Sequence, residues 1–439
     1  MLRKVTAAAF VSGAARRKTR RRLIVGGVTI AVAAATAAVA LSGPGSHPRG
    51  LTVSQHHVTA AKRAAVAAAS TLAAPAAPSP PALLTAGQQG TRQDVPWSRV
   101  GPGWILATRS PVRPGGATTL FLIDPAGGRY SLDTLPAEAA NSPEPDHLVA
   151  WSGDGERALL DSDLYSAHVG VLNLRTGTAA EFWLGSGVSP LGFTTPDGLA
   201  ILAEASTDPA RPHLERFSLS GALEQAYPAS FSGGGYYNGI SAVYSPDGTE
   251  LAVSTSAAME LMSNDGQVIR ALPTGPSASN CAPVRWWTTT ELLARCDPPR
   301  AGIAQLWLVP VSGAPATALT ASPAARGDEG DLDAWPLPAG TYVQDAGACG
   351  YVYLARLQAN RQTAPVTVPG VPQGDSVIVA GSYADELAII AQPPCGAGAS
   401  LLRYSPAQGT TTPLLGGTAP GGGSVTAAFL FGEPVGLVP

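Results

Sequence analysis

The sequence predicts an all-β fold built from seven four-stranded repeats, and three observations support this prediction. Short apolar segments joined by glycine-containing turns recur through most of the 439 residues. The two ends of this region carry complementary parts of one repeat. The period is about 43–49 residues, because the first segments of six successive repeats start near Leu148, Leu191, Ile240, Val284, Leu332 and Val377. Four short strands per unit at such a period are typical of the blades of a β-propeller.

The repeat is most regular in the region that begins at His147. The apolar segment HLVAW is followed by the turn SGDG, the segments RALLDSD and HVGVLNL, the turn RTG and the segment AAEFWL. The next two repeats have the turns TPDG and SPDG at the first of these places. Asp-Gly between short apolar segments is a strong hairpin signal, because the turn needs a positive φ that glycine adopts freely.

The two ends of the repeat region predict how the ring closes. Near the start, WILAT, TTLFLID and RYSLDTL supply a second, third and fourth strand without a first. Near the end, Val425–Phe431 supplies a first strand with only a short tail after it. Pairing of these parts completes a seventh blade, with the C-terminal strand closing the first blade, and leaves no open sheet edge in the ring. A two-sheet sandwich or a jelly roll does not predict such ends, and six or eight blades are the alternatives to seven.

One turn carries a resemblance to a known family. Ser245-Pro246-Asp247-Gly248, with the flanking segments AVY and ELAVS, resembles the repeat of the WD40-like propellers found in TolB and related bacterial proteins. The turns at 195–198 and 152–155 are weaker copies, and the resemblance covers about residues 97–431. It implies a β-propeller in which the Asp-Gly turn is a structural element. The α/β domain that precedes the propeller in TolB has no counterpart in this sequence.

The N-terminal region predicts attachment to a membrane. Residues 1–22 contain eight basic residues and no acidic one, and Leu23–Leu41 is a run of 19 uncharged residues. At 1.5 Å per residue such a run just crosses a hydrocarbon core of ~30 Å, and the basic side stays in the cytoplasm. We therefore expect a basic cytoplasmic tail (1–22), one transmembrane anchor (23–41) and a body outside the cell membrane. The alternative is a signal segment cleaved near Ala38–Ala40, with a loose twin-arginine pattern before it, which gives a secreted protein.

Composition separates a tether from the folded body. Residues 42–96 are rich in Ala, Pro, Gly and Ser and poor in large apolar residues, which predicts a disordered tether, followed by the propeller at 97–439. The net charge is −3, and since residues 1–22 contribute +8, the remainder carries 20 basic and 31 acidic residues, or −11. An acidic body argues against a nucleic-acid partner, because phosphate binding requires a basic face.

All four cysteines lie in the exported part, where disulfide bonds form. In the predicted hairpin that turns at Thr288-Thr289, Cys281 and Cys296 lie opposite each other, so we expect them to be bonded. Cys349 and Cys395 occupy equivalent loops of consecutive blades, and a second disulfide between them is expected. A four-thiolate zinc site is the alternative, but the Cys-x-x-Cys spacing typical of such sites is absent.

Candidate ligand residues lie where the chain leads into the first strand of each blade, because those strands line the central channel. Carboxylates around one opening could bind a cation or a basic ligand, although solvated turn residues are the simpler interpretation. The candidates are Asp146, His147, Tyr236, Tyr237, Asn238, Asp328, Asp331, Asp333 and Asp375. The first strands also contain Trp286, Trp287 and Trp335, which we expect to pack between blades rather than to stack on a ligand.

No nucleophile elbow, zinc-protease motif or phosphate-binding loop is present. We therefore expect a membrane-tethered, extracytoplasmic and monomeric propeller that binds a protein, a peptide or an envelope component without catalysis, metal or cofactor. The alternative is a propeller enzyme of the lactonase, quinoprotein or hydrolase type with its site in the central channel. A sensor is a third option, although the cytoplasmic tail is too short for a folded output domain.

Overall fold

The structure is a computed structural model. The chain divides into two compact units, Met1–Pro75 and Ala76–Pro439, and all residues whose placement is described belong to the second. The described ranges are 82–111, 116–135, 147–161, 168–206, 212–228, 241–255, 258–274, 280–297, 303–321, 328–347, 350–394, 398–417 and 422–433.

The second unit is a seven-bladed β-propeller, as the sequence predicts. Blade 1 contains β1 (Gln89–Thr91), β2 (Ile105–Ser110), β3 (Thr118–Ile123), β4 (Arg129–Leu135) and β29 (Ser424–Leu430). Blade 2 contains β5 (His147–Trp151), β6 (Arg157–Asp161), β7 (His168–Asn173) and β8 (Ala179–Trp183). Blade 3 contains β9 (Val188–Phe193), β10 (Ala200–Ala205), β11 (His213–Ser218) and β12 (Leu223–Ala226). Blade 4 contains β13 (Ala242–Tyr244), β14 (Glu250–Ser254), β15 (Met259–Ser263) and β16 (Val268–Leu272).

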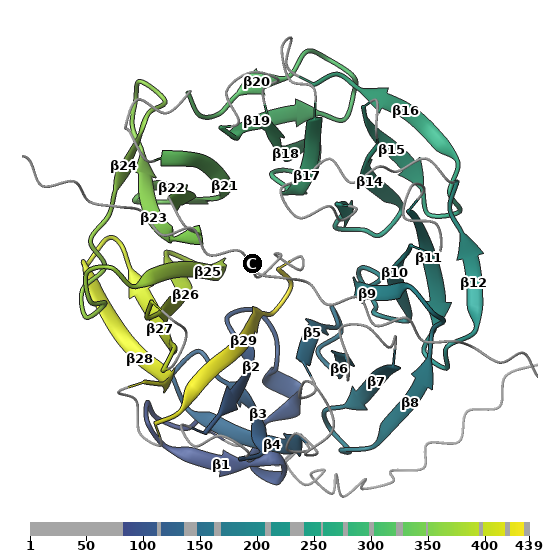
Figure 1. The fold of residues 1–439 in the computed structure, drawn as a ribbon. Coiled ribbons are helices and arrows are strands. Elements are labelled where there is room, and N and C mark those ends of the chain that lie inside the picture. The colour runs from purple at the N-terminus through teal and green to yellow at the C-terminus, as the bar shows by residue number, and fades with distance from the viewer. Residues whose placement is uncertain are drawn as a thin grey trace, which may run out of the picture. The chain divides into compact units, whose positions relative to one another are not determined.

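The remaining three blades follow the same order. Blade 5 contains β17 (Asn280–Trp286), β18 (Glu291–Asp297), β19 (Gln305–Pro310) and β20 (Thr317–Ala318). Blade 6 contains β21 (Asp328–Leu337), β22 (Gly340–Gly347), β23 (Val352–Leu357) and β24 (Thr363–Pro365). Blade 7 contains β25 (Ser376–Tyr383), β26 (Glu386–Gln392), β27 (Ser400–Ser405) and β28 (Thr410–Gly416). In blades 2 to 7 the first strand lies nearest the centre of the ring, and in blade 1 β29 takes this position (Figure 1).

The C-terminal strand closes the ring as predicted. β29 pairs antiparallel with β2, from Ile105 opposite Leu430 to Ser110 opposite Ser424. β29 also contacts β25 on one side and β5 on the other. Its side chains Ala428 and Leu430 are buried, since they pack in a core cluster shared by blades 7 and 1.

The start of the folded chain differs from the sequence prediction. β1 lies within 42–96, the range predicted to be tether, and pairs parallel with β4 on the outer edge of blade 1. The 3-10 helices η1 (Arg92–Asp94) and η2 (Trp97–Arg99) follow it. Leu83 and Leu84 pack against the blade 1 core, so the propeller begins upstream of residue 97. The tail at 1–22 and the membrane segment at 23–41 lie outside the described residues, and no helix within the described part is long and apolar enough to span a membrane.

The Asp-Gly turns have a structural role. In blade 4 the Ser245 hydroxyl donates to the Asp247 carboxylate at 2.6 Å, and the Glu250 amide donates to the Ser245 hydroxyl at 3.0 Å. Ser152 and Asp154 repeat this pattern in blade 2, again at 2.6 Å. A Cβ on Gly248, whose φ is +71°, would lie 1.9 Å from the carbonyl oxygen of Thr195 in blade 3. The turns therefore interlock neighbouring blades, which requires glycine at this position.

One of the two expected disulfides is confirmed. Cys281 and Cys296 are bonded across the β17–β18 hairpin, where they occupy opposite positions. The bond crosslinks the first two strands of blade 5. Cys349 and Cys395 lie outside the described residues, so the second disulfide stays a prediction.

Candidate functional site

The two ends of the central channel carry different parts of each blade. We call the end with the Asp-Gly turns, Ser152–Gly155, Thr195–Gly198 and Ser245–Gly248, the turn face. The opposite end, where the chain leads into each first strand, is the loop face. Because every blade repeats the same up-and-down order, equivalent turns fall on the same face all around the ring.

Of the predicted ligand residues, the structure describes the side chains of His147, Asp331, Asp333 and Asp375. His147 is the first residue of β5 and Asp375 directly precedes β25, and both are half-buried on the loop face. Asp331 and Asp333 are buried within β21. Asp146, Tyr236, Tyr237, Asn238 and the side chain of Asp328 lie outside the described residues.

Asp333 belongs to a buried ionic network. Its Oδ1 accepts a hydrogen bond from Arg285 Nε at 2.9 Å, and its Oδ2 accepts a second one from Arg285 Nη2. Arg285 Nη1 donates to Glu433 Oε2 at 2.7 Å. Glu433 Oε1 in turn accepts from the backbone amide of Ser382 at 3.0 Å and from its hydroxyl at 3.2 Å. The network therefore links β17, β21, β25 and the segment after β29.

Irregularities in the first strands bring these side chains together. The register of β17 against β18 shifts between Pro283 and Arg285, and that of β21 against β22 shifts between Asp331 and Asp333. β25 has a similar shift, which ends at Gly381, next to Ser382. A β-bulge redirects the side chains beside it. Each of the three blades thus contributes its network residue at or directly after a bulge.

Burial and charge oppose each other in this network. Burial raises the pKa of Asp333, and the hydrogen bonds from Arg285 only partly offset this effect. Burial alone would lower the pKa of Arg285, but Asp333 and Glu433 more than offset it and raise that pKa. Arg285 therefore stays a cation. Its guanidinium also lies 4.7 Å from the ring centre of Trp335, a favourable cation–π distance.

The three tryptophans in or directly after the first strands pack between blades, as expected. Trp335 is buried in a cluster shared by blades 6 and 7. Trp286 packs against a cluster of blades 4 and 5, and Trp287 against a cluster of blades 5 and 6. These side chains therefore contribute to the core.

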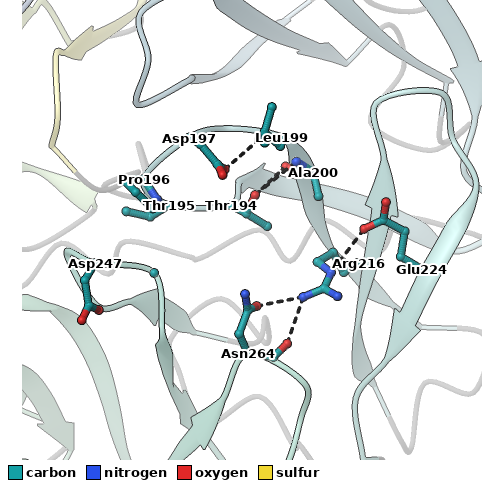
Figure 2. Close-up of a pocket in the computed structure, with 11 residues that line it drawn as sticks. Thr194, Thr195, Pro196, Asp197, Leu199, Ala200, Arg216, Glu224, Asp247 and Asn264 are labelled. Carbon is teal, nitrogen blue, oxygen red and sulfur yellow. Dashed lines mark hydrogen bonds and ion pairs between the residues drawn. The ribbon is translucent and has the colours of Figure 1, made fainter. Parts of the chain in front are cut away.

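An open pocket of about 390 Å³ lies between blades 3 and 4 on the turn face. Figure 2 shows the turn of blade 3 on one side of this pocket, Asp247 and Asn264 of blade 4 on another, and Arg216 on a third. Its lining comes from Thr194, Thr195, Pro196, Asp197, Leu199, Ala200, Arg216, Glu224, Asp247, Gly248 and Asn264. The pocket exists only because two blades meet, since neither blade supplies all of its walls.

The pocket is acidic overall. Arg216 Nη1 donates to the Asn264 carbonyl oxygen at 2.9 Å and to its Oδ1 at 2.8 Å, and Arg216 Nε lies 3.4 Å from Glu224 Oε2. Asp197 and Asp247 are exposed at the rim. Hydrogen bonds from Ser245 and Thr249 lower the pKa of Asp247, which favours its anionic form. Three carboxylates against one guanidinium favour a ligand with a positive charge.

Leu199 adds an apolar contact at the pocket rim, because 57% of its surface is exposed. Within the described ranges, no group of three or more His, Cys, Asp or Glu side chains is arranged to hold a metal ion. No sequence pattern indicates this pocket, because its lining residues are spread over 71 positions, from Thr194 to Asn264. Arg285 is recognisable in the sequence as the single charged residue of β17, whereas Asp333 is one of four acidic residues in β21.

The sequence matches no family model and no curated protein. Among solved structures, the β-propeller domain of the Trilobed protease from Pyrococcus furiosus is 11% identical over 73% of this chain and 95% of its own, with a TM-score of 0.47. A 6-phosphogluconolactonase-like protein from Bacteroides uniformis is 13% identical over 71% of this chain and 94% of its own, with a TM-score of 0.44.

A prolyl endopeptidase is 12% identical over 71% of this chain, with a TM-score of 0.47, and the match covers 50% of its own length. This chain thus spans about half the length of that enzyme. At these identities the likeness concerns the fold alone. The strand order of the structure itself shows the seven-bladed propeller, while the TolB-type repeat stays a prediction.

Proposed function

We propose that this chain is a binding propeller that a membrane anchor holds outside the cell, and that it recognises a partner through the turn-face pocket between blades 3 and 4. One observation carries the proposal: the pocket is open to solvent and combines exposed carboxylates with the exposed side chain of Leu199. Such a surface suits a protein or peptide segment with a basic and an apolar residue. An envelope component with the same groups is an alternative ligand.

The sequence supports the location. Eight basic residues precede an uncharged run of 19 residues, which fits an anchor with the N-terminus in the cytoplasm. The confirmed disulfide fits an oxidising compartment outside the cytoplasm. We further propose that the repeats are of the WD40-like type found in TolB, because three Asp-Gly turns occupy the same place in successive blades.

The test compares capture of envelope proteins by the unit from Ala76 onward and by two variants. Leu199→Ser changes the pocket rim, whereas Val268→Thr changes an equally exposed apolar residue on β16 that is not part of the pocket lining. We expect a partner that binds the wild type and Val268→Thr but is lost with Leu199→Ser. A partner that binds all three equally would exclude the pocket as its site.

The second candidate function is a propeller enzyme. The named solved structures that share the fold are peptidases and lactonase-like proteins, which is the observation in favour of this alternative. Hydrolysis of a panel of lactones and chromogenic peptides by the purified propeller would support it. Activity that His147→Ala or Asp375→Asn abolishes would place the site on the loop face of the channel.

A further inference from the structure

The three residues after β29 contact blade 1, both of its neighbours and the distant blade 5. The backbone amide of Phe431 donates to the carbonyl oxygen of Trp104 in blade 1 at 2.9 Å. The Phe431 ring contacts Trp151 of blade 2, with ring centres 5.2 Å apart. Glu433 bonds to blades 5 and 7 through Arg285 and Ser382. A segment that touches blades 1, 2, 5 and 7 must lie across the turn-face end of the channel, and Figure 1 shows β29 pointing toward the ring centre.

The partners of Glu433 form a complete binding site for one carboxylate. Arg285 Nη1 donates a hydrogen bond to one oxygen at 2.7 Å, and the Ser382 amide and hydroxyl donate to the other at 3.0 and 3.2 Å. These are charge-assisted hydrogen bonds, the stronger kind. The side chains of Arg285 and Glu433 are only 9% and 17% exposed, so solvent screens the contact weakly.

The site is held in shape by groups other than Glu433. Asp333 binds Arg285 through two hydrogen bonds, and the Trp335 ring lies against the guanidinium. The Ser382 amide belongs to β25. The orientation of the donors therefore does not depend on the carboxylate that they bind.

The chain also makes room for this carboxylate. A Cβ on Gly381 would lie 2.7 Å from Glu433 Cγ and 2.8 Å from Leu430 Cβ, at a φ of +150°. Any larger residue at position 381 would push the segment away. The donors of the site support the same conclusion: without Glu433, Arg285 Nη1 becomes a buried donor that lacks this acceptor. An unsatisfied buried donor costs free energy, so the empty site attracts a new acceptor.

We propose that the turn-face end of the channel is a carboxylate-binding site that Glu433 occupies as an internal ligand. The ligand class is a carboxylate on an extended chain, such as an acidic side chain of a partner peptide. Such a ligand binds when the C-terminal segment withdraws, so Glu433 controls access to the site.

The first test is chemical rescue of the full-length Glu433→Ala variant. We expect its Tm to fall by about 5 °C, and sodium acetate to restore most of the loss with half-maximal effect at about 10–100 mM. Sodium chloride at the same ionic strength should not do so. Glu386→Ala is the matched control, because Glu386 forms a more exposed ion pair with Arg403 in blade 7, and acetate should not rescue it.

The second test measures ligand affinity directly. The dipeptide N-acetyl-Gly-Glu-amide mimics the end of the segment, and N-acetyl-Gly-Gln-amide lacks only the charge. By titration calorimetry we expect Glu433→Ala to bind the Glu peptide at least ~10-fold more tightly than the Gln peptide, and the wild type to bind neither. Rescue by acetate without peptide binding would restrict the ligand to small free carboxylates and overturn the assignment to a partner chain.

Two results would overturn the proposal as a whole. One is acetate acting no better than chloride on Glu433→Ala, or equally well on Glu386→Ala. The other is equal affinity for the two dipeptides. If Glu433→Ala does not fold, the peptide titration is made on Glu433→Ser, whose short side chain also leaves the site empty.

Discussion

Removal of β29 should unfold the whole propeller rather than one blade. A chain that ends at Gly423 lacks the strand that pairs with β2 and joins blade 1 to its neighbours. The change is confined to the end of the sequence, yet it reopens the ring. We therefore expect the loss of one strand to have a global effect.

The magnitude follows from the side chains that β29 buries. Val425, Phe429 and Leu430 are all buried, and full burial contributes about 2 kcal/mol for each of them. The two buried alanines, Ala427 and Ala428, add about 1.5 kcal/mol together. The resulting loss of about 7–8 kcal/mol is comparable with the ~5–15 kcal/mol of net stability of a typical folded protein.

The assay is thermal unfolding followed by circular dichroism on chains that begin at Ala76. The chain that ends at Gly423 should lack a cooperative transition, and a synthetic peptide of residues 424–439 should restore one. A chain that ends at Glu433 is the matched control and should melt like the full unit. Cooperative melting of the Gly423 chain at the temperature of the full unit would refute closure by the C-terminal strand.

Three further predictions concern the disulfide, a turn glycine and a buried tyrosine. Replacement of Cys281 and Cys296 by alanine should cost about 3 kcal/mol in urea unfolding, because the bond closes a loop with a sequence separation of 15. Gly248→Ala should lower the free energy of unfolding by about 3 kcal/mol or more, because its Cβ would clash with the Thr195 oxygen. Gly409 has a φ of +62° but open space around it, so Gly409→Ala should cost only about 1 kcal/mol in the same assay. Burial raises the pKa of Tyr244, so the folded state favours its neutral form. The free energy of unfolding that the neutral Tyr244 contributes is fully present below the pKa of an unfolded tyrosine, about 10, and falls by up to ~1.4 kcal/mol per unit of pH above it. In Tm measurements above about pH 10, the Tyr244→Phe variant should therefore lose less stability than the wild type.

The architecture could be predicted because its signals are local and repeated. Asp-Gly or a similar pair indicates each hairpin turn, and the period follows from the number of residues between successive first strands. The pairing of Cys281 with Cys296 followed from the register of one hairpin, and the structure confirms it. The closing strand was recognisable because the first blade lacked one.

β1 could not be predicted for a physical reason. A strand of three residues, Gln89–Thr91, has too little length to show an alternating pattern. Its position depends on the free edge of β4, which only the folded blade provides. The composition of the preceding residues indicates a tether, and nothing in the sequence marks the point where the chain joins the sheet.

The ionic network could not be predicted, because it depends on β-bulges and on contacts between residues that are far apart in the sequence. Arg285 and Glu433 are 148 residues apart, and each bulge that directs a network side chain shifts the register by one position. The sequence analysis treats Asp333 as one of several ligand candidates on the channel. In the structure both of its oxygens accept hydrogen bonds from Arg285, so this carboxylate is neutralised within the protein.

The turn face thus contains charged groups that are buried in a network and charged groups that are exposed in a pocket. This difference determines where each proposed function can operate. Glu433 and its partners lie at the turn-face end of the channel, whereas His147 and Asp375 lie on the loop face, where we expect the substrate of a channel enzyme to enter while the C-terminal segment is in place. Asp197 and Asp247, in contrast, are exposed outside the channel, between blades 3 and 4. Binding at that pocket requires no movement of the C-terminal segment. Activity or binding that depends on Leu199 but not on Glu433 would therefore favour the binding module, and dependence on loop-face residues would favour the enzyme.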